Sequence, residues 1–239
     1  MKLKVLITIL FMSPLVFFYF GCEKSNNIIG NYNVITETRN LTEFHVLRSE
    51  GSFEINVTID TINEISIEAE ENLIPYIYTK IHGSTLIIKN SSNFYIQEHY
   101  PIIINVKTKN LDDVKLSGSG EIYCDSLNTD YFETDLLGSG EIYTNIWANY
   151  IDANISGSGE ITFWGESSES DFNISGSGDM LSYNLIQDTC YINISGSGDM
   201  FVNVTDLLDV TISGSGNVHY KGNPVVKSQI TGSGKLIHH

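Results

Sequence analysis

Residues 155–161 read Ile-Ser-Gly-Ser-Gly-Glu-Ile, and close variants of this stretch recur throughout the second half of the chain. Self-similarity at a fixed period of about nineteen residues is typical of a solenoid, in which each repeat forms one turn. The Gly-Ser-Gly motif provides two glycines per repeat: Gly118 and Gly120, Gly138 and Gly140, Gly157 and Gly159, Gly176 and Gly178, Gly196 and Gly198, Gly214 and Gly216, and Gly232 and Gly234.

Each repeat has an apolar residue two positions before its first glycine and another four positions after it, such as Ile155 and Ile161. Side chains alternate between the two faces of a strand, so both should point inward, and the acidic residue beside the second, such as Glu160, should point outward. Glycine suits the corner because it reaches positive φ and lets neighbouring backbones approach closely. A flexible linker is disfavoured, because linkers lack apolar residues at fixed offsets.

A single strand–corner–strand unit cannot bury its apolar face alone, whereas units stacked about 4.8 Å apart share a continuous core. We therefore predict an all-β fold, a parallel β-helix with Gly-Ser-Gly corners over residues 113–239. Alternating strands between residues 34 and 112, for example Phe53 to Ile59, predict irregular first rungs or a capping sheet continuous with the repeats. A cap is needed because an open solenoid end exposes unpaired strand edges.

The Ile-Ser-Gly-Ser-Gly stretches at 155–161 and 174–180 resemble the family described as "putative auto-transporter adhesin, head GIN domain". The resemblance extends upstream to residues 44–47, 53–59 and 83–88, and so covers most of the chain after about residue 40. It implies a right-handed β-helix similar in shape to pectate lyases, without their catalytic residues, and an adhesive role. The departures are small: Leu137 replaces the usual Ser before its glycine, and Lys235 replaces the acidic residue of the last repeat.

The N-terminus has the pattern of a signal peptide over residues 1–21, with Lys2 and Lys4 before an apolar run from Val5 to Phe20. The Gly21-Cys22 pair that follows resembles a lipobox, which implies cleavage before Cys22 and lipid attachment to it. Residues 22–33 would then be a polar tether, and the mature protein an outer-membrane lipoprotein at the cell surface or the periplasmic face. A membrane-spanning anchor is the alternative, although the run is shorter than the roughly twenty residues that a helix needs to cross a bilayer.

The formal net charge of the chain is −16, and no Lys or Arg occurs between Leu116 and Tyr220. The repeat surface is therefore strongly negative, which makes nucleic acid and anionic lipid poor partners for it, and we expect no nucleic acid partner. Carboxylates share one outward position of successive repeats, and we expect them to form a solvated ridge: Glu121, Glu141, Glu160, Asp179 and Asp199. A row of calcium sites is the alternative, because oxygen ligands suit this cation. No cofactor is expected.

Motifs of common catalytic and metal sites are absent from the sequence, which has no C-x-x-C, H-E-x-x-H or G-x-S-x-G pattern. Cys124 and Cys190 lie about three rungs apart, beyond the roughly 7 Å limit for a disulfide, so we predict two structural thiols. The Ser of each motif is expected to be a turn residue, since no His recurs beside it. We therefore predict that the protein is not an enzyme.

A carbohydrate-active hydrolase is the main alternative, because β-helices host many such enzymes and hydrolysis needs only two suitably spaced carboxylates. A lyase is disfavoured, because the repeats offer no Lys or Arg to neutralise a uronate. Two acidic clusters could provide a hydrolytic pair: Asp130, Glu133 and Asp135, or Glu166, Glu169 and Asp171.

The function that the sequence favours is a non-catalytic binding or adhesion module with an unidentified glycan or protein ligand at the cell envelope. Three outward aromatic residues, each five positions after a glycine, form a candidate contact stripe: Tyr123, Tyr143 and Phe201. Stacked aromatic residues also stabilise sheets, so that role is an open alternative for the stripe. A purely structural envelope spacer, with no ligand, is the third functional class.

Overall fold

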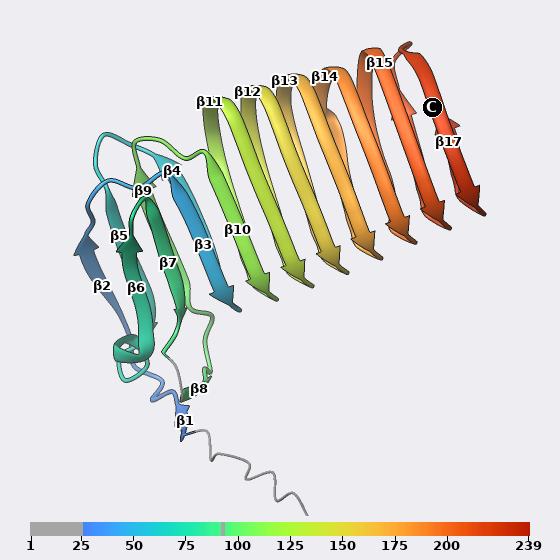
Figure 1. Ribbon diagram of the computed structural model, residues 1–239. Helices are drawn as coiled ribbons and strands as arrows, with labels where there is room; N and C mark the ends of the chain where they lie inside the picture. The colour runs from blue at the N-terminus through green and yellow to red at the C-terminus, as the bar shows by residue number, and fades with distance from the viewer. Residues whose placement is uncertain (1–25, 92–93) are drawn as a thin grey trace, which may run out of the picture.

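The computed structural model describes residues 26–91 and 94–239, which form an elongated all-β solenoid with a cap at its N-terminal end (Figure 1). The repeats follow one another in space as they do in sequence, from β10 (Asp113–Gly118) beside the cap to β17 (Val225–Gly232) at the far end. The predicted fold class, a β-helix of Gly-Ser-Gly repeats, is confirmed. The predicted signal peptide and Cys22 lie outside the described residues.

Five strands each form most of one turn of the solenoid, because the backbone stays paired around the bends. They are β11 (Glu121–Gly138), β12 (Glu141–Gly157), β13 (Glu160–Gly176), β14 (Asp179–Gly196) and β15 (Met200–Gly214). The chain ends with β16 (Asn217–Lys221), β17 and β18 (Lys235–His238). Neighbouring strands of the repeats pair in parallel, and equivalent positions stack, as in the pairs Glu141–Glu160 and Gly157–Gly176.

The alternation of buried and outward side chains explains how one strand can bend around a core. In β12 the buried side chains include Ile142 and Ile146 before the bend and Ile151 and Ile155 after it. The inward positions change from even to odd numbers next to Asn149, where two outward residues follow each other and the chain turns. Burial of one such side chain contributes about 1.5–3 kcal/mol, and every rung repeats it.

The first glycine of each corner is required by space as well as by backbone conformation. Gly157 has a φ of +137°, and a Cβ built on it would collide with the carbonyl oxygen of Gly138 in the preceding rung. The backbone N–H of Ser158 donates to that same oxygen at 2.8 Å, and equivalent bonds form at five other corners. A side chain at this position would therefore disturb the contact that holds one rung to the next.

The cap consists of strands that precede β10. β1 (Asn26–Ile29) pairs with β8 (Phe94–Gln97) in a separate two-stranded sheet. β3 (Val46–Gly51) pairs with β10 and β4 (Glu54–Ile59) with β11, so the main sheet passes from the cap into the repeats without a break. The remaining cap elements are β2 (Val34–Asn40), β5 (Glu64–Glu70), η1 (Ile74–Tyr76, a turn of 3-10 helix), β6 (Ile77–His82), β7 (Thr85–Asn90) and β9 (Ile103–Thr108).

The two ends of the solenoid differ in how they are covered. At the cap, β2 pairs antiparallel with β5, β5 with β9, and β6 with β7. At the far end β17 pairs only with β15 among the described strands. Ile230 stacks in register on the buried Ile212, as its predicted inward position requires, but it is 40% exposed because no described strand stacks on its rung. The two thiols, Cys124 and Cys190, are buried and free as predicted.

Candidate binding surface

The first half of each rung presents the acidic row on its outer face. Glu121, Glu141 and Glu160 lie in register with one another, and Asp179 continues the row. The row is hydrogen-bonded: the backbone N–H of Asp199 donates to Oδ1 of Asp179 at 2.8 Å. Across the part of the chain that the structure describes, no three His, Cys, Asp or Glu side chains are grouped as a metal site would need.

The predicted aromatic stripe lies beside this row, and its rings stack on neighbouring rings. Tyr123 stacks on Tyr143 with ring centroids 4.8 Å apart, and Tyr143 stacks on Trp164 at 6.2 Å. Phe201 stacks on His219 at 4.7 Å and is separated from the tyrosines by two rungs without an aromatic residue in this column. Such stacking stabilises the sheet.

The tyrosine hydroxyls of the stripe are engaged with the acidic row. The Tyr123 hydroxyl donates to Glu121 at 2.7 Å, and Tyr143 makes the same contact with Glu141. The hydrogen bond to Glu121, together with partial burial, raises the pKa of Tyr123 to about 12. These hydroxyls therefore remain protonated donors, and they serve the carboxylates of their own rungs.

A different arrangement occurs at the bend between the two halves of the rungs, where a hollow of about 320 Å³ opens to solvent. We call it the Trp147 groove. Two rows of outward side chains from four successive rungs form its walls: Asn128, Trp147, Glu166 and Ile186 in the first row, and Asp130, Asn149, Ser168 and Asp188 in the second. Its floor is made of small residues: Thr129, Ala148 and Ser167. The groove therefore runs along the solenoid axis.

Trp147 is the most distinctive side chain of the groove. It is 42% exposed, and unlike Tyr123 and Tyr143 it stacks on no other aromatic ring of the described residues. Beside it the Asn149 amide donates to Oδ1 of Asp130 at 2.8 Å, which holds both planar groups in place across adjacent rungs. The groove thus combines a free apolar ring face with oriented hydrogen-bonding groups.

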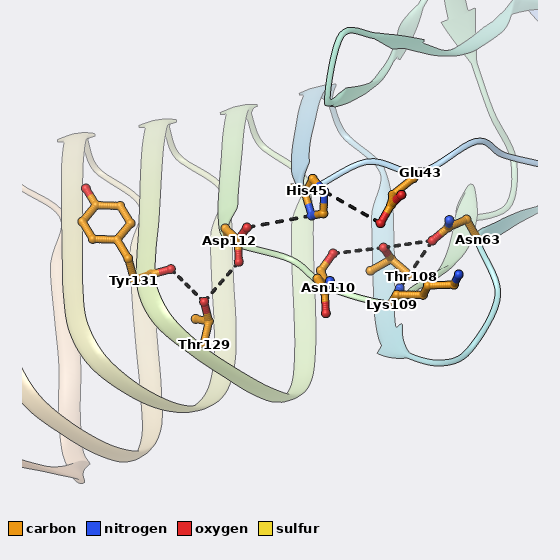
Figure 2. Close-up of polar contacts among 9 residues, drawn as sticks. All are labelled: Glu43, His45, Asn63, Thr108, Lys109, Asn110, Asp112, Thr129 and Tyr131. Carbon is orange, nitrogen blue, oxygen red and sulfur yellow. Dashed lines mark hydrogen bonds and ion pairs between the residues drawn. The ribbon is translucent and has the colours of Figure 1, made fainter.

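A second hollow, of about 270 Å³, lies next to the groove where the repeats meet the cap, and it shares Asn128 and Thr129 with the groove. Figure 2 shows its polar contacts. The Thr129 hydroxyl donates to Oδ1 of Asp112 at 3.1 Å, and the other oxygen of Asp112 lies 3.9 Å from Nδ1 of His45. Lys109 also lines this hollow, so its charge is more balanced than that of the groove.

The structure separates the carboxylates that the sequence grouped as hydrolytic candidates. Glu133 and Asp135 lie on the second half of the rung, where they bind Lys115 at 2.7 and 2.6 Å. Asp130 instead faces the Trp147 groove. Similarly, Asp171 accepts a hydrogen bond from Asn173 on the second half of its rung, whereas Glu166 lines the groove. The carboxylates that meet in one hollow are Asp130, Glu166 and Asp188, from three different rungs.

Lys115 lies among three carboxylates near the start of the repeats. It is 3.3 Å from Asp113, in addition to its contacts with Glu133 and Asp135. Burial raises the pKa of Asp113 to about 6, and the neighbouring Lys115 opposes this shift. The site is therefore a compact ion-pair network.

A third hollow, of about 360 Å³, lies on the second half of the rungs and is lined by rows of Asn and Ser side chains. The amides of this row bind one another and their own rungs: Asn193 donates to Asn173 at 3.1 Å, and Asn173 donates to Asp171. No aromatic residue lines this hollow. It therefore lacks the aromatic ring surface that Trp147 gives to the groove.

Trp147 was not among the predicted site residues. The signal that could have found it is composition, since the chain has two Trp residues, and Trp147 stands where the neighbouring repeats have polar or aliphatic residues. The position of the bend could not be predicted from the sequence. The alternation of inward and outward residues does not by itself show where two outward residues follow each other.

Comparison with known proteins supports the fold. No curated protein matches the chain significantly. A "putative adhesin" structure from Bacteroides fragilis superposes with a TM-score of 0.83 at 20% identity, covering 89% of this chain and 100% of that one. A "putative adhesin" from Parabacteroides merdae gives 0.74 at 22%, with 90% and 99% covered. A "putative lipid binding protein" from Parabacteroides distasonis gives 0.74 at 24%, with 90% and 100% covered.

Among residues 26–91 and 94–239, no helix is long and apolar enough to cross a membrane. The family model described as "Putative auto-transporter adhesin, head GIN domain" matches residues 43–224, which include all four rungs of the Trp147 groove. Because this match extends over most of the chain and agrees with the repeat architecture, the protein belongs to the family described as "Putative auto-transporter adhesin, head GIN domain".

Proposed function

We propose that this protein is a non-catalytic binding module of the cell envelope, which attaches to a glycan or protein ligand through the outer surface of its solenoid. The adhesin description of its family supports a binding role at the cell surface or envelope. The observation that carries the proposal is the Trp147 groove, in which an exposed indole stands among carboxylate, amide and hydroxyl groups. Apolar surface combined with a few placed polar groups is typical of recognition sites.

The scaffold supports binding because it holds these groups at defined spacings. Each rung of the groove is paired in parallel with its neighbours on both sides of the bend, for example at Trp147–Glu166 before it and Tyr150–Glu169 after it. A site whose backbone is already ordered loses less conformational entropy when a ligand binds. The regular rungs therefore favour a ligand that extends over several of them.

We propose that a lipid attached to Cys22, after the apolar N-terminal run, holds the protein at the cell envelope. Replacement of Cys22 by Ser should move the protein from the detergent-extracted membrane fraction to the soluble periplasmic fraction. Fractionation followed by immunoblotting measures this, with Cys124→Ser as a control that retains the anchor. If the Cys22→Ser protein stays in the membrane, the lipid anchor is wrong.

The binding function is tested with beads that carry residues 23–239 through their N-terminal end, as the tether would. These residues include every described strand. The beads should adhere saturably to cells, outer-membrane vesicles or purified matrix components, and soluble protein should compete. Beads carrying heat-unfolded protein are the control. If the beads adhere to none of these surfaces, the structural spacer is favoured over the binding module.

A glycan hydrolase is the second candidate, and one observation favours it: Asp130, Glu166 and Asp188 line the same hollow. Inverting hydrolases use two carboxylates about 6.5–9.5 Å apart, and residues on different rungs can reach such separations. Release of reducing ends from a bound polysaccharide would support this candidate over non-catalytic binding.

A further inference from the structure

We propose that the Trp147 groove, together with the adjoining hollow at the cap, binds an extended neutral polysaccharide along the solenoid axis. This inference rests on the proposed binding function and names its ligand class. It follows from three features of the groove: its direction, its mixture of side chains and its charge.

The direction of the groove matches a polymer rather than a compact small molecule. The same two outward positions of four rungs form its walls, and successive rungs are about 4.8 Å apart. The hollow at the cap extends the path by a further rung, through Thr129 and Asp112, which are hydrogen-bonded to each other. A pyranose unit advances a glycan chain by a length close to one strand spacing, so successive units can meet equivalent positions of successive rungs.

The side chains of the groove provide the two kinds of contact that sugars make. The ring face of a pyranose carries C–H groups, which pack on a flat aromatic surface such as the exposed indole of Trp147. Vicinal hydroxyls bind planar groups with paired donors and acceptors, and the Asp130–Asn149 pair is held in such an orientation. Glu166, in register with Trp147, offers a further acceptor on the same wall.

A peptide strand fits the groove less well, because peptides that bind to sheets usually add a strand at an open edge. In the groove the backbone of β12 is paired with β11 on one side and β13 on the other, through Trp147 itself. No edge is therefore available there for strand addition, and recognition has to come from side chains.

The charge of the groove favours a neutral glycan over an acidic one. Asp130, Glu166 and Asp188 line the groove, and the sequence has no Lys or Arg between Leu116 and Tyr220, so Lys109 of the adjoining hollow is a cation only at the cap end of the path. A uronate or sulfated sugar would place its negative charges beside these carboxylates, where they repel. Neutral hexose polymers carry hydroxyls only and meet no such penalty.

The test uses the intrinsic fluorescence of Trp147 in residues 23–239. In a Trp164→Phe background Trp147 is the one tryptophan left, since the chain has two. Neutral β-linked glucan and mannan oligosaccharides of increasing length should shift its emission saturably, and the affinity should rise with length until the groove is filled. Polygalacturonate oligosaccharides of matched length should bind at least about tenfold more weakly.

Two matched variants assign the site. Trp147→Ala should lower the affinity for the neutral oligosaccharide at least about tenfold by calorimetry, with an unchanged melting temperature because the ring is exposed. Trp164→Ala, which removes a comparably exposed tryptophan outside the groove, should leave the affinity unchanged. Trp147→Tyr should recover part of the loss, because a tyrosine ring can also pack on a sugar.

The outcomes separate this inference from the function on which it rests. If Trp147→Ala binds as tightly as the parent protein, or if the acidic glycan binds better, the inference is wrong. If no glycan binds while the protein-coated beads still adhere to cells, the ligand class is wrong and the binding function stands. If no glycan binds and the protein-coated beads do not adhere, both the ligand class and the binding function are wrong. If reducing ends appear and are lost in Glu166→Gln, the groove assignment stands and the non-catalytic function falls.

Discussion

The repeats and the cap both enclose an apolar core, but they are built on different principles. In the repeats the same side chain stacks on itself, as Ile142 does on Ile122 and Ile161. In the cap antiparallel strands of differing sequence surround a buried carboxylate, Glu70, which accepts the backbone N–H groups of Tyr32 and His99. Repetition makes the first architecture apparent from the sequence, whereas the second depends on specific long-range contacts.

Within the repeats, the same contrast distinguishes outward positions that keep one kind of side chain from those that we assign to ligand binding. The acidic row has the same kind of side chain in successive rungs, and its members bind their own neighbours. The first wall of the Trp147 groove has four different residues at one repeat position: Asn128, Trp147, Glu166 and Ile186. We therefore propose ligand binding at the exposed repeat position where the side chains differ from rung to rung.

The largest expected effect concerns the repeat corners. Gly157→Val should lower the free energy of unfolding by about 1–3 kcal/mol, because the side chain is strained at positive φ and collides with Gly138. Urea denaturation measures this. Ser158→Ala should change stability by less than about 0.5 kcal/mol. In the cap, Gly83→Ala should cost only about 1 kcal/mol, since Gly83 has positive φ but open space around it. Equal losses for Gly157→Val and Ser158→Ala would contradict the corner model.

The next effect concerns the buried carboxylate of the cap. Burial raises the pKa of Glu70, but hydrogen bonds from His99 and Tyr32 outweigh it, and the net pKa lies below the ordinary value of 4.5. Glu70→Gln should therefore cost about 2 kcal/mol at pH 7. Because the folded pKa is lowered, this advantage is complete above about pH 4.5 and disappears as the pH falls through the lowered value.

Urea denaturation of the parent and Glu70→Gln proteins over a pH series measures this effect. Glu68→Gln, at an exposed position of the same strand, is the control and should be nearly silent. A stability difference that grows in acid would show that hydrogen bonding to the carboxylate does not hold this part of the cap.

A smaller effect is expected where the repeats meet the cap. Lys115→Met should cost about 1 kcal/mol at pH 7, because it leaves Asp113, Glu133 and Asp135 without their cation. Burial already raises the pKa of Asp113 to about 6. Removal of Lys115 raises the pKa of Asp113 further, so this part of the cost should decline as the pH falls towards about 6 and be absent below it, a window above that of Glu70. Thermal unfolding between pH 7 and pH 4.5 measures it, and a cost independent of pH would contradict it.

The smallest effect concerns the acidic row. Its carboxylates repel each other more in the fold than in the unfolded chain, so monovalent salt should raise the melting temperature slightly through screening. Calcium at the same ionic strength should add little. A saturable calcium effect that chelator reverses, and that is lost in a Glu141→Gln/Glu160→Gln double variant, would instead identify cation sites.

Much of the repeat architecture could be predicted, because it depends on short-range rules. Strand alternation assigns Ile155 and Ile161 to the core, and their burial agrees with that assignment. The spacing between Cys124 and Cys190 excludes a disulfide once the rungs are counted, and both thiols are free. Alternation also predicts that Ile230 points inward, and it stacks in register on the buried Ile212, but alternation does not say whether another rung covers a side chain, and Ile230 is 40% exposed.

The sequence by itself determined the period, the corner glycines and the side chains that face the core, since each of these follows from backbone geometry within one repeat. Only the tertiary structure decided which outward residues form a site. Asp130, Glu133 and Asp135 are close in sequence, but the bend between them sends them to different faces, whereas Asp130, Trp147 and Glu166 meet although they are many residues apart. The reason is physical: neighbours along the axis come from successive rungs, and the position of the bend depends on how the enclosed side chains pack.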